Sequence, residues 1–250
     1  MRPAAATIDG VPLLPLSHPL RKVLDVGVPR HWTGVIGDAG GYVIDGRPVP
    51  RVTQIVSLAR LQVPWETEPA TAEELSRIYA TRGPMGLHIH AVTAAYPGTV
   101  ACPSEVCGGE CGAYRAQFGR FVETYRPVFL RRETPVFSRL HGYAGTPDWI
   151  AVIGDRVLIG DTKTGRAYPQ VALQLAGYRH AEFTIDADGT ETPIPQCSGG
   201  VVLSLFPDSY ELRAVRCDDD VFQAFLSLRN FYDHKLALES AAVGSPYPVP

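Results

Sequence analysis

Two aspartates and a lysine near the middle of the chain have the types and spacing of a metal site. Asp148 and Asp161 are separated by two short apolar runs that meet at Gly154-Asp155. A glycine in the first place of a two-residue loop predicts a β-hairpin. Because both aspartates lie six residues from this turn, we expect them opposite one another, with Cβ atoms about 5 Å apart.

This arrangement suits the hydrolysis of a phosphodiester bond. Two opposed carboxylates repel each other unless a cation neutralises them, and hard oxygen ligands favour Mg²⁺ or Mn²⁺. Lys163 follows Asp161 by two residues and points to the same face, where its ammonium group could orient or deprotonate an attacking water. A metal would polarise a phosphoryl oxygen. The alternative is a strand-entry aspartate and a surface ion pair, but the preceding apolar run predicts burial, where unpaired charge is costly.

These residues resemble the signature of the PD-(D/E)xK nuclease superfamily, and within it the RecB-type nuclease domains and related phage exonucleases. Pro147-Asp148 and Asp161-Thr162-Lys163 match the central motif. Gln174 and Tyr178 lie four residues apart on one face of the next predicted helix and resemble the downstream motif. For these two residues, ordinary helix polarity is the alternative interpretation.

An upstream segment extends the resemblance. Gly86-Leu-His-Ile-His90 resembles the family's Gly/His motif, in which the histidine binds metal, although Leu87 stands where threonine is usual. His88 and His90 point about 200° apart on a helix, so only one can face the site. The spacing from Gly86 favours His90.

The resemblance implies a metal-dependent deoxyribonuclease with a restriction-endonuclease-like core. Glu133 stands where the family has its first acidic residue, although a salt bridge with Arg131 or Arg132 is an alternative. The implied metal ligands are His90, Asp148, Asp161 and the backbone carbonyl of Thr162. The implied catalytic residues are Asp148, Asp161, Lys163 and Glu133. The residues implied to support the site or contact DNA are Gln174 and Tyr178.

The function expected from this resemblance is a DNA exonuclease of recombination, repair or phage DNA metabolism. Its expected partner is DNA, and a helicase or recombinase is a further candidate partner. An endonuclease of the same fold and a non-catalytic DNA-binding module are the alternatives. A paired-carboxylate glycosidase is more distant, because it would give Lys163 no role.

The remaining sequence predicts an α/β (α+β) fold, in which helices flank a central mixed sheet. A single domain is expected over 1–250, with a β-rich N-terminal extension over 1–50 and a Pro-rich tail over 240–250. A break is expected at Gly83-Pro84. Helices are predicted over 72–81, 87–96, 113–126, 169–182 and 221–238, and strands over 32–36, 42–44, 134–137, 148–153, 157–161, 201–206 and 210–215.

Composition is that of a folded domain. The 250 residues are 45% hydrophobic and 20% charged, with a net charge of −3, which excludes a disordered, collagen-like or membrane-spanning chain. No signal-peptide core is present at the N-terminus, since prolines interrupt its apolar stretch. We therefore expect a cytoplasmic protein, of a bacterium or a phage-infected cell, without a membrane partner.

The charge is unevenly distributed. Residues 113–180 carry 10 basic and 5 acidic side chains, whereas 181–250 carry 4 and 11. The motif-bearing segment is therefore basic, and arginines such as Arg166 could meet phosphate groups. Pairing of these arginines with the acidic C-terminal third is the alternative.

Three cysteines, Cys102, Cys107 and Cys111, lie in a Gly-rich loop. With Cys197 or Cys217 as a fourth ligand they could form a Zn²⁺ site. An iron–sulfur cluster of related nucleases would need one cysteine before the core and three after it, and this chain does not have that pattern. Free thiols, or a pair that oxidises, are the alternative.

Overall fold

The computed structural model describes residues 7–8, 11–12, 41–59, 61, 72–101, 109–186 and 189–244. A five-stranded sheet in the order β13-β12-β9-β8-β5 lies at its centre. The sheet is mixed, because β12 runs parallel to β9 and the other neighbours are antiparallel. Its strands are β5 (Val128–Arg132), β8 (Trp149–Ile153), β9 (Arg156–Thr164), β12 (Gly199–Leu205) and β13 (Tyr210–Val215).

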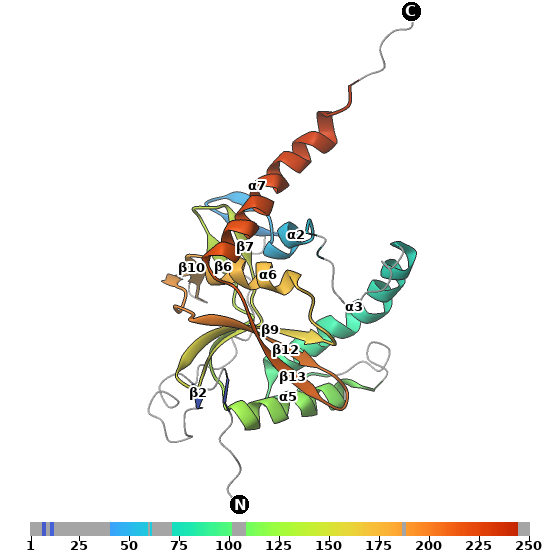
Figure 1. Ribbon diagram of the computed structural model, residues 1–250, viewed down its shortest axis with the longest axis vertical. Coiled ribbons are helices and arrows are strands. Elements are labelled where there is room, and N and C mark those ends of the chain that lie inside the picture. Colours follow the sequence, from blue (N-terminus) through green and yellow to red (C-terminus); the bar gives the residue numbers. More distant parts are fainter. Residues whose placement is uncertain are drawn as a thin grey trace, which may run out of the picture.

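Helices cover both faces of this sheet, as predicted (Figure 1). On one face lie α2 (Val52–Val56), α6 (Gln170–Arg179) and α7 (Asp219–Ala241), and on the other lie α3 (Ala72–Ala95) and α5 (Cys111–Tyr125). Alternate strand residues supply the two cores, since successive side chains point to opposite faces. Ile150 and Ile159 pack toward α6, whereas Trp149 and Leu158 pack toward α5.

A smaller antiparallel sheet in the order β11-β10-β6-β7 flanks the central one. A hairpin with its turn at Asp45-Gly46 lies beside it, and both turn residues have the positive φ that a type I′ turn requires. The remaining strands are β1 (Thr7–Ile8), β2 (Val11–Pro12), β3 (Tyr42–Ile44), β4 (Arg47–Val49), β6 (Val136–Ser138), β7 (Tyr143–Gly145), β10 (Phe183–Ile185) and β11 (Glu191–Pro193).

The central hairpin has the predicted register. Trp149 pairs with Gly160 and Ile153 pairs with Arg156 across a turn at 154–155. Gly154 has φ 66°, which suits a turn with glycine first. The positions of Asp148 and Asp161 therefore follow from the turn chemistry.

The predicted helix break at Pro84 is wrong, because α3 continues through this residue. Proline removes one backbone N–H donor, but its fixed φ is itself helical, so the chain direction can persist. The second half of α3 also packs firmly, with Ile89 completely buried in the core against α5. Helix α2 and strands β5, β7, β10 and β11 were not predicted, and the predicted strand over 32–36 lies outside the described residues.

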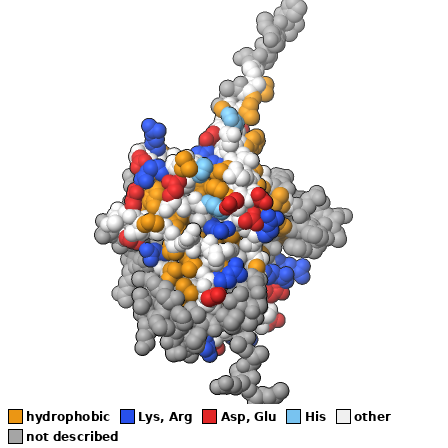
Figure 2. Space-filling view, turned by 60° about the vertical axis from the view of Figure 1, so that its left-hand side comes forward, with side chains coloured by type: hydrophobic (Ala, Val, Ile, Leu, Met, Phe, Trp, Pro, Cys, Tyr) orange, Lys and Arg blue, Asp and Glu red, His pale blue; other side chains and the backbone are white. Residues whose placement is uncertain are grey.

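The C-terminal half of α7 projects from the body (Figure 1). In Figure 2, apolar side chains follow this projecting part, and basic and acidic side chains are interspersed over the face shown. None of the helices in the described ranges is long and apolar enough to cross a bilayer.

Candidate metal and catalytic site

Asp148 and Asp161 meet at the open end of the central hairpin. Asp148 directly precedes β8, and its Oδ2 accepts a hydrogen bond from the backbone N–H of Thr162 in β9. This bond fixes the Asp148 carboxylate against β9. Asp161 is 1% exposed, and burial raises the pKa of its carboxyl, while the nearby Lys163 ammonium opposes that rise.

Lys163 and helix α6 enclose the Asp161 carboxylate. The Lys163 Nζ lies 2.8 Å from Asp161 Oδ2, and the Gln174 amide donates to Asp161 Oδ1 at 2.8 Å. Gln174 also donates to the Tyr178 hydroxyl at 3.3 Å. Two residues of the central motif, Asp161 and Lys163, thus form one polar network with Gln174 and Tyr178 on the α6 face of the sheet.

His90 of α3 completes the other side of the site. Its Nδ1 lies 3.2 Å from Asp148 Oδ2, whereas the Nε2 of His88 is buried without a hydrogen-bond partner. The choice of His90 over His88 as the residue that faces the site agrees with this geometry. Gly86 lies where α3 approaches β9, and a Cβ there would make an ordinary contact, at 3.6 Å, with the Thr164 hydroxyl oxygen.

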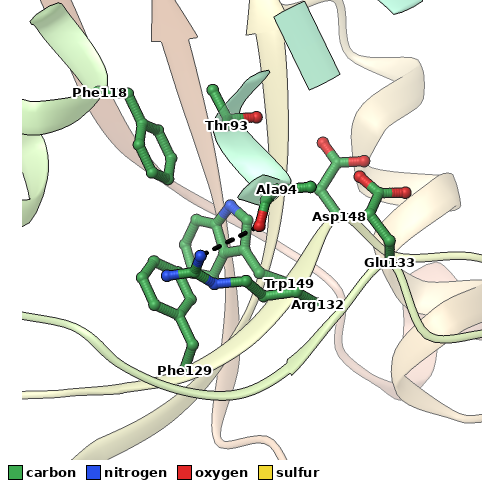
Figure 3. A pocket seen from close by; sticks show the side chains of 8 residues that line it. All are labelled: Thr93, Ala94, Phe118, Phe129, Arg132, Glu133, Asp148 and Trp149. Atoms are coloured by element: carbon green, nitrogen blue, oxygen red, sulfur yellow. Dashed lines mark hydrogen bonds between the residues drawn. The ribbon is translucent and has the colours of Figure 1, made fainter. Parts of the chain in front are cut away.

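Glu133 lies beside Asp148, as Figure 3 shows. It follows β5 in a left-handed conformation, with φ 45°, and its N–H donates to the Asp148 carbonyl oxygen at 3.0 Å. Left-handed backbone is uncommon for a residue with a side chain. This turn of the backbone at the end of β5 places Glu133 next to Asp148.

The two arginines considered as partners of Glu133 have other contacts. Arg131 pairs with Asp186 at 3.7 Å. Arg132 donates hydrogen bonds to the carbonyl oxygens of Ala94 and Tyr96 near the end of α3. A cavity of about 10 Å³, enough for about one water molecule, has a lining that includes Arg132, Glu133, Asp148 and the rings of Phe118, Phe129 and Trp149 (Figure 3).

One nitrogen and two carboxylate oxygens converge at this point. Among the described residues, His90, Glu133 and Asp148 each offer one ligand atom, and these atoms lie within 4.8 Å of one another. Imidazole and carboxylate donors fit Mn²⁺, and Mg²⁺ accepts one or two such carboxylates with water. The donor set thus fits a divalent ion. Of the predicted metal ligands this cluster contains His90 and Asp148, and Glu133, which was predicted as catalytic, joins them. The Asp161 carboxylate contacts Lys163 and Gln174 instead.

Electrostatics within this cluster reflect crowded charge. Burial and the neighbouring Asp148 raise the pKa of Glu133 to about 8, although His90 lowers it in part. Burial disfavours protonation of His90, but the Asp148 carboxylate outweighs that cost and raises the pKa of His90 to about 9. Perturbed groups of this kind are typical of functional sites.

Two glycines, Gly160 of β9 and Gly145 of β7, allow aromatic rings to lie against the backbone near the site. A Cβ on Gly160 would lie 2.2 Å from the Trp149 ring, and one on Gly145 would lie 2.4 Å from the Tyr178 ring. The Trp149 indole N–H donates to the Thr162 hydroxyl at 3.2 Å. The ring of Trp149 therefore supports β9 directly beneath the site residues.

The other predicted residues lie apart from the cluster. Arg166 is exposed on the loop after β9. Cys102 and Cys107 lie outside the described residues, and Cys111 takes part in a disulfide bond. Cys197 and Cys217 are buried free thiols. Sequence reasoning treated Arg132 only as a salt-bridge partner, and no motif indicated its contact with α3.

Comparison with known proteins found similar solved structures. The crystal structure of LHK-Exo in complex with dAMP is 11% identical, with a TM-score of 0.39, and the match covers 76% of this chain and 89% of that one. The crystal structure of SSO0001 is 13% identical, with a TM-score of 0.34, over 78% and 85% of the two chains. No protein-family model and no curated protein matches the sequence.

Proposed function

We propose that this chain is a divalent-metal-dependent DNA nuclease of the PD-(D/E)xK type, most simply an exonuclease. The observation that carries the proposal is the convergence of a His90–Glu133–Asp148 donor set with the Lys163–Asp161 pair at one end of a rigid hairpin. Metal donors next to a half-buried lysine are the groups needed to activate water at a phosphodiester.

The residues divide the chemistry between them. His90, Glu133 and Asp148 would hold the metal, with Asp161 next to them. When bound, Mg²⁺ or Mn²⁺ supplies a Lewis acid that polarises the phosphoryl oxygen. Lys163 orients the attacking water through its ammonium group, and Asp161 and Gln174 hold Lys163 in place. Tyr178 positions Gln174 from the next turn of α6.

Charge supports a nucleic-acid substrate in this part of the chain. Segment 113–180, which holds the hairpin and Glu133, has 10 basic and 5 acidic side chains, although the chain as a whole carries −3. A locally basic segment can neutralise phosphates when the total charge is negative. Arg166, exposed just beyond Lys163, is proposed as one DNA contact.

A digestion panel tests this function. Linear and circular DNA, each single- and double-stranded, is incubated with the protein and Mg²⁺ or Mn²⁺, and with Lys163→Ala as the control. We expect loss of linear DNA from its ends, and a rate about 10²–10⁴-fold lower for the variant. Cleavage of circular DNA would instead support an endonuclease. If every form of DNA stays intact although the protein binds it tightly, the result would support the non-catalytic DNA-binding module.

A further inference from the structure

A second hollow lies beside the candidate site, on the same face of the central sheet. Its volume is about 410 Å³, and it lies between the β12–β13 hairpin and the loop that joins β9 to α6. Pockets of about 300–1,000 Å³ are typical of small-molecule sites. The side chains that line it include Arg166, Ser204, Phe206, Glu211 and Arg213.

Strand register joins this hollow to the site. Ser204 of β12 is the parallel partner of Lys163 in β9, and Glu211 of β13 is the partner of Ser204. Paired residues point to the same face, and neighbouring strands lie about 4.8 Å apart. Lys163 therefore lies between Asp161 and the hollow, and a DNA strand held at the metal donors would reach the hollow with its next nucleotides.

The lining is chemically suited to a base and poorly suited to a phosphate. Arg213 donates two hydrogen bonds to one Glu211 carboxylate oxygen, at 2.8 and 2.9 Å. This pairing offsets the charge that would attract a phosphate. The same pair offers guanidinium donors and carboxylate acceptors of the kind that read base edges. Phe206 adds a half-buried aromatic ring, and such rings stack on bases.

We propose that this hollow is a nucleobase-binding subsite, which takes one base of the DNA strand next to the phosphate held at the metal donors. Phe206 supplies the stacking surface, Glu211 and Arg213 contact the base edge, and Arg166 contacts the adjoining phosphate. The subsite rests on the proposed nuclease function and extends it. It would give the enzyme a preference among bases at one fixed distance from the cleaved bond.

The test is a binding measurement on the full chain, without divalent metal so that no DNA is cut. Fluorescence anisotropy measures the affinity for a labelled single-stranded DNA of about 12 nucleotides. The measurement is repeated with a series of DNAs of the same sequence, each of which lacks one base at a different position. Phe206→Ala and Phe206→Leu are compared, because leucine keeps the packing and removes the stacking. Arg120→Ala is the matched control, since Arg120 is exposed on α5 at the opposite face of the sheet.

We expect both Phe206 variants to bind intact DNA about 5- to 100-fold more weakly than the unaltered protein. At one position, removal of the base should lower the affinity of the unaltered protein for DNA by a similar factor, and it should leave the affinity of the Phe206 variants unchanged. Equal affinity of variants and unaltered protein, or a loss that is the same for every abasic DNA, would overturn the subsite while leaving the nuclease proposal intact. An unaltered protein that neither binds nor cuts DNA would overturn both.

Discussion

Arg132 of β5 donates a hydrogen bond to the backbone carbonyl oxygen of Tyr96, just after the last residue of α3. Its guanidinium also donates to the Ala94 carbonyl at 3.2 Å and lies 3.7 Å from the centre of the Phe129 ring. Carbonyls at a helix C-terminus lack internal partners, and a cation there is favourable. His90 lies one helical turn before Ala94, so Arg132 fixes His90 relative to Glu133.

Arg132→Ala should therefore weaken metal binding through His90. We expect the Mn²⁺ dissociation constant to rise about 10- to 100-fold, as for other groups that orient metal ligands, and Arg132→Lys to recover part of the loss. In a His90→Ala background the further loss from Arg132→Ala should vanish. Calorimetric titration with Mn²⁺ measures the unaltered protein, both Arg132 variants, His90→Ala and the double variant.

The matched control for this cycle is Arg131→Ala, which removes the neighbouring arginine and its surface pair with Asp186. It should leave Mn²⁺ affinity unchanged. If Arg132→Ala costs as much affinity in the His90→Ala background as alone, Arg132 acts only on general stability and the positioning role is wrong.

Glu133 should destabilise the metal-free protein. Burial and Asp148 raise its pKa from 4.5 to about 8 in the fold. A raised carboxyl pKa means that stability is retained below the unfolded value and is lost as pH rises from about 4.5 to 8. Glu133→Gln should therefore increase the free energy of unfolding at about pH 8 by 1 kcal/mol or more, since one pKa unit equals about 1.4 kcal/mol, with a smaller gain at about pH 5.

Mn²⁺ should raise the free energy of unfolding of the same variant less than that of the unaltered protein, because one donor is lost. Denaturant unfolding with and without Mn²⁺ measures both effects. Glu123→Gln, at an exposed position on α5, is the control and should change neither. A Glu133→Gln protein that is less stable at about pH 8 without metal would show that the carboxylate is favourably paired.

Gly160 should be intolerant of a side chain. A Cβ there would lie 2.2 Å from the Trp149 ring, which has no flexible end that could move aside. Overpacking in a core costs about 1–3 kcal/mol or more, so Gly160→Ala should lower the free energy of unfolding by at least that amount. Gly112→Ala is the control, because its Cβ would meet nothing within 4 Å on helix α5. Equal stability of the two variants would contradict the contact.

The hairpin was predictable because its determinants are local. Gly154 sets the turn, and the turn sets the register that brings Asp148 opposite Asp161. The α5, α6 and β13 segments followed equally from periodicity and caps, with ends within a few residues. Pro84 shows the limit of local rules, since packing of the following turns outweighs a single missing donor.

The composition of the donor set could not be read from the sequence. Glu133 reaches His90 and Asp148 only because its own backbone turns left-handed after β5. Asp161 lies in the network but is enclosed by side chains from β9 and α6. Both outcomes depend on how α3 and α6 approach the hairpin from opposite sides. Spacing along the chain does not contain that information.

The buried thiols Cys197 and Cys217 should be inert in the folded protein. They are 4% and 2% exposed, and burial raises the pKa of Cys197 from 9.0 to about 12. The thiolate is the reactive form, so iodoacetamide at about pH 8 should leave both residues unmodified in native protein and modify both in concentrated guanidinium chloride. Residue-resolved mass spectrometry reads the outcome. The contribution of Cys197 to the free energy of unfolding should be constant below about pH 9 and fall as the pH rises toward 12, because in that range the Cys197 thiol ionises only in the unfolded chain. Rapid native labelling of Cys197 would mean that the core between α6 and β12 opens readily to solvent.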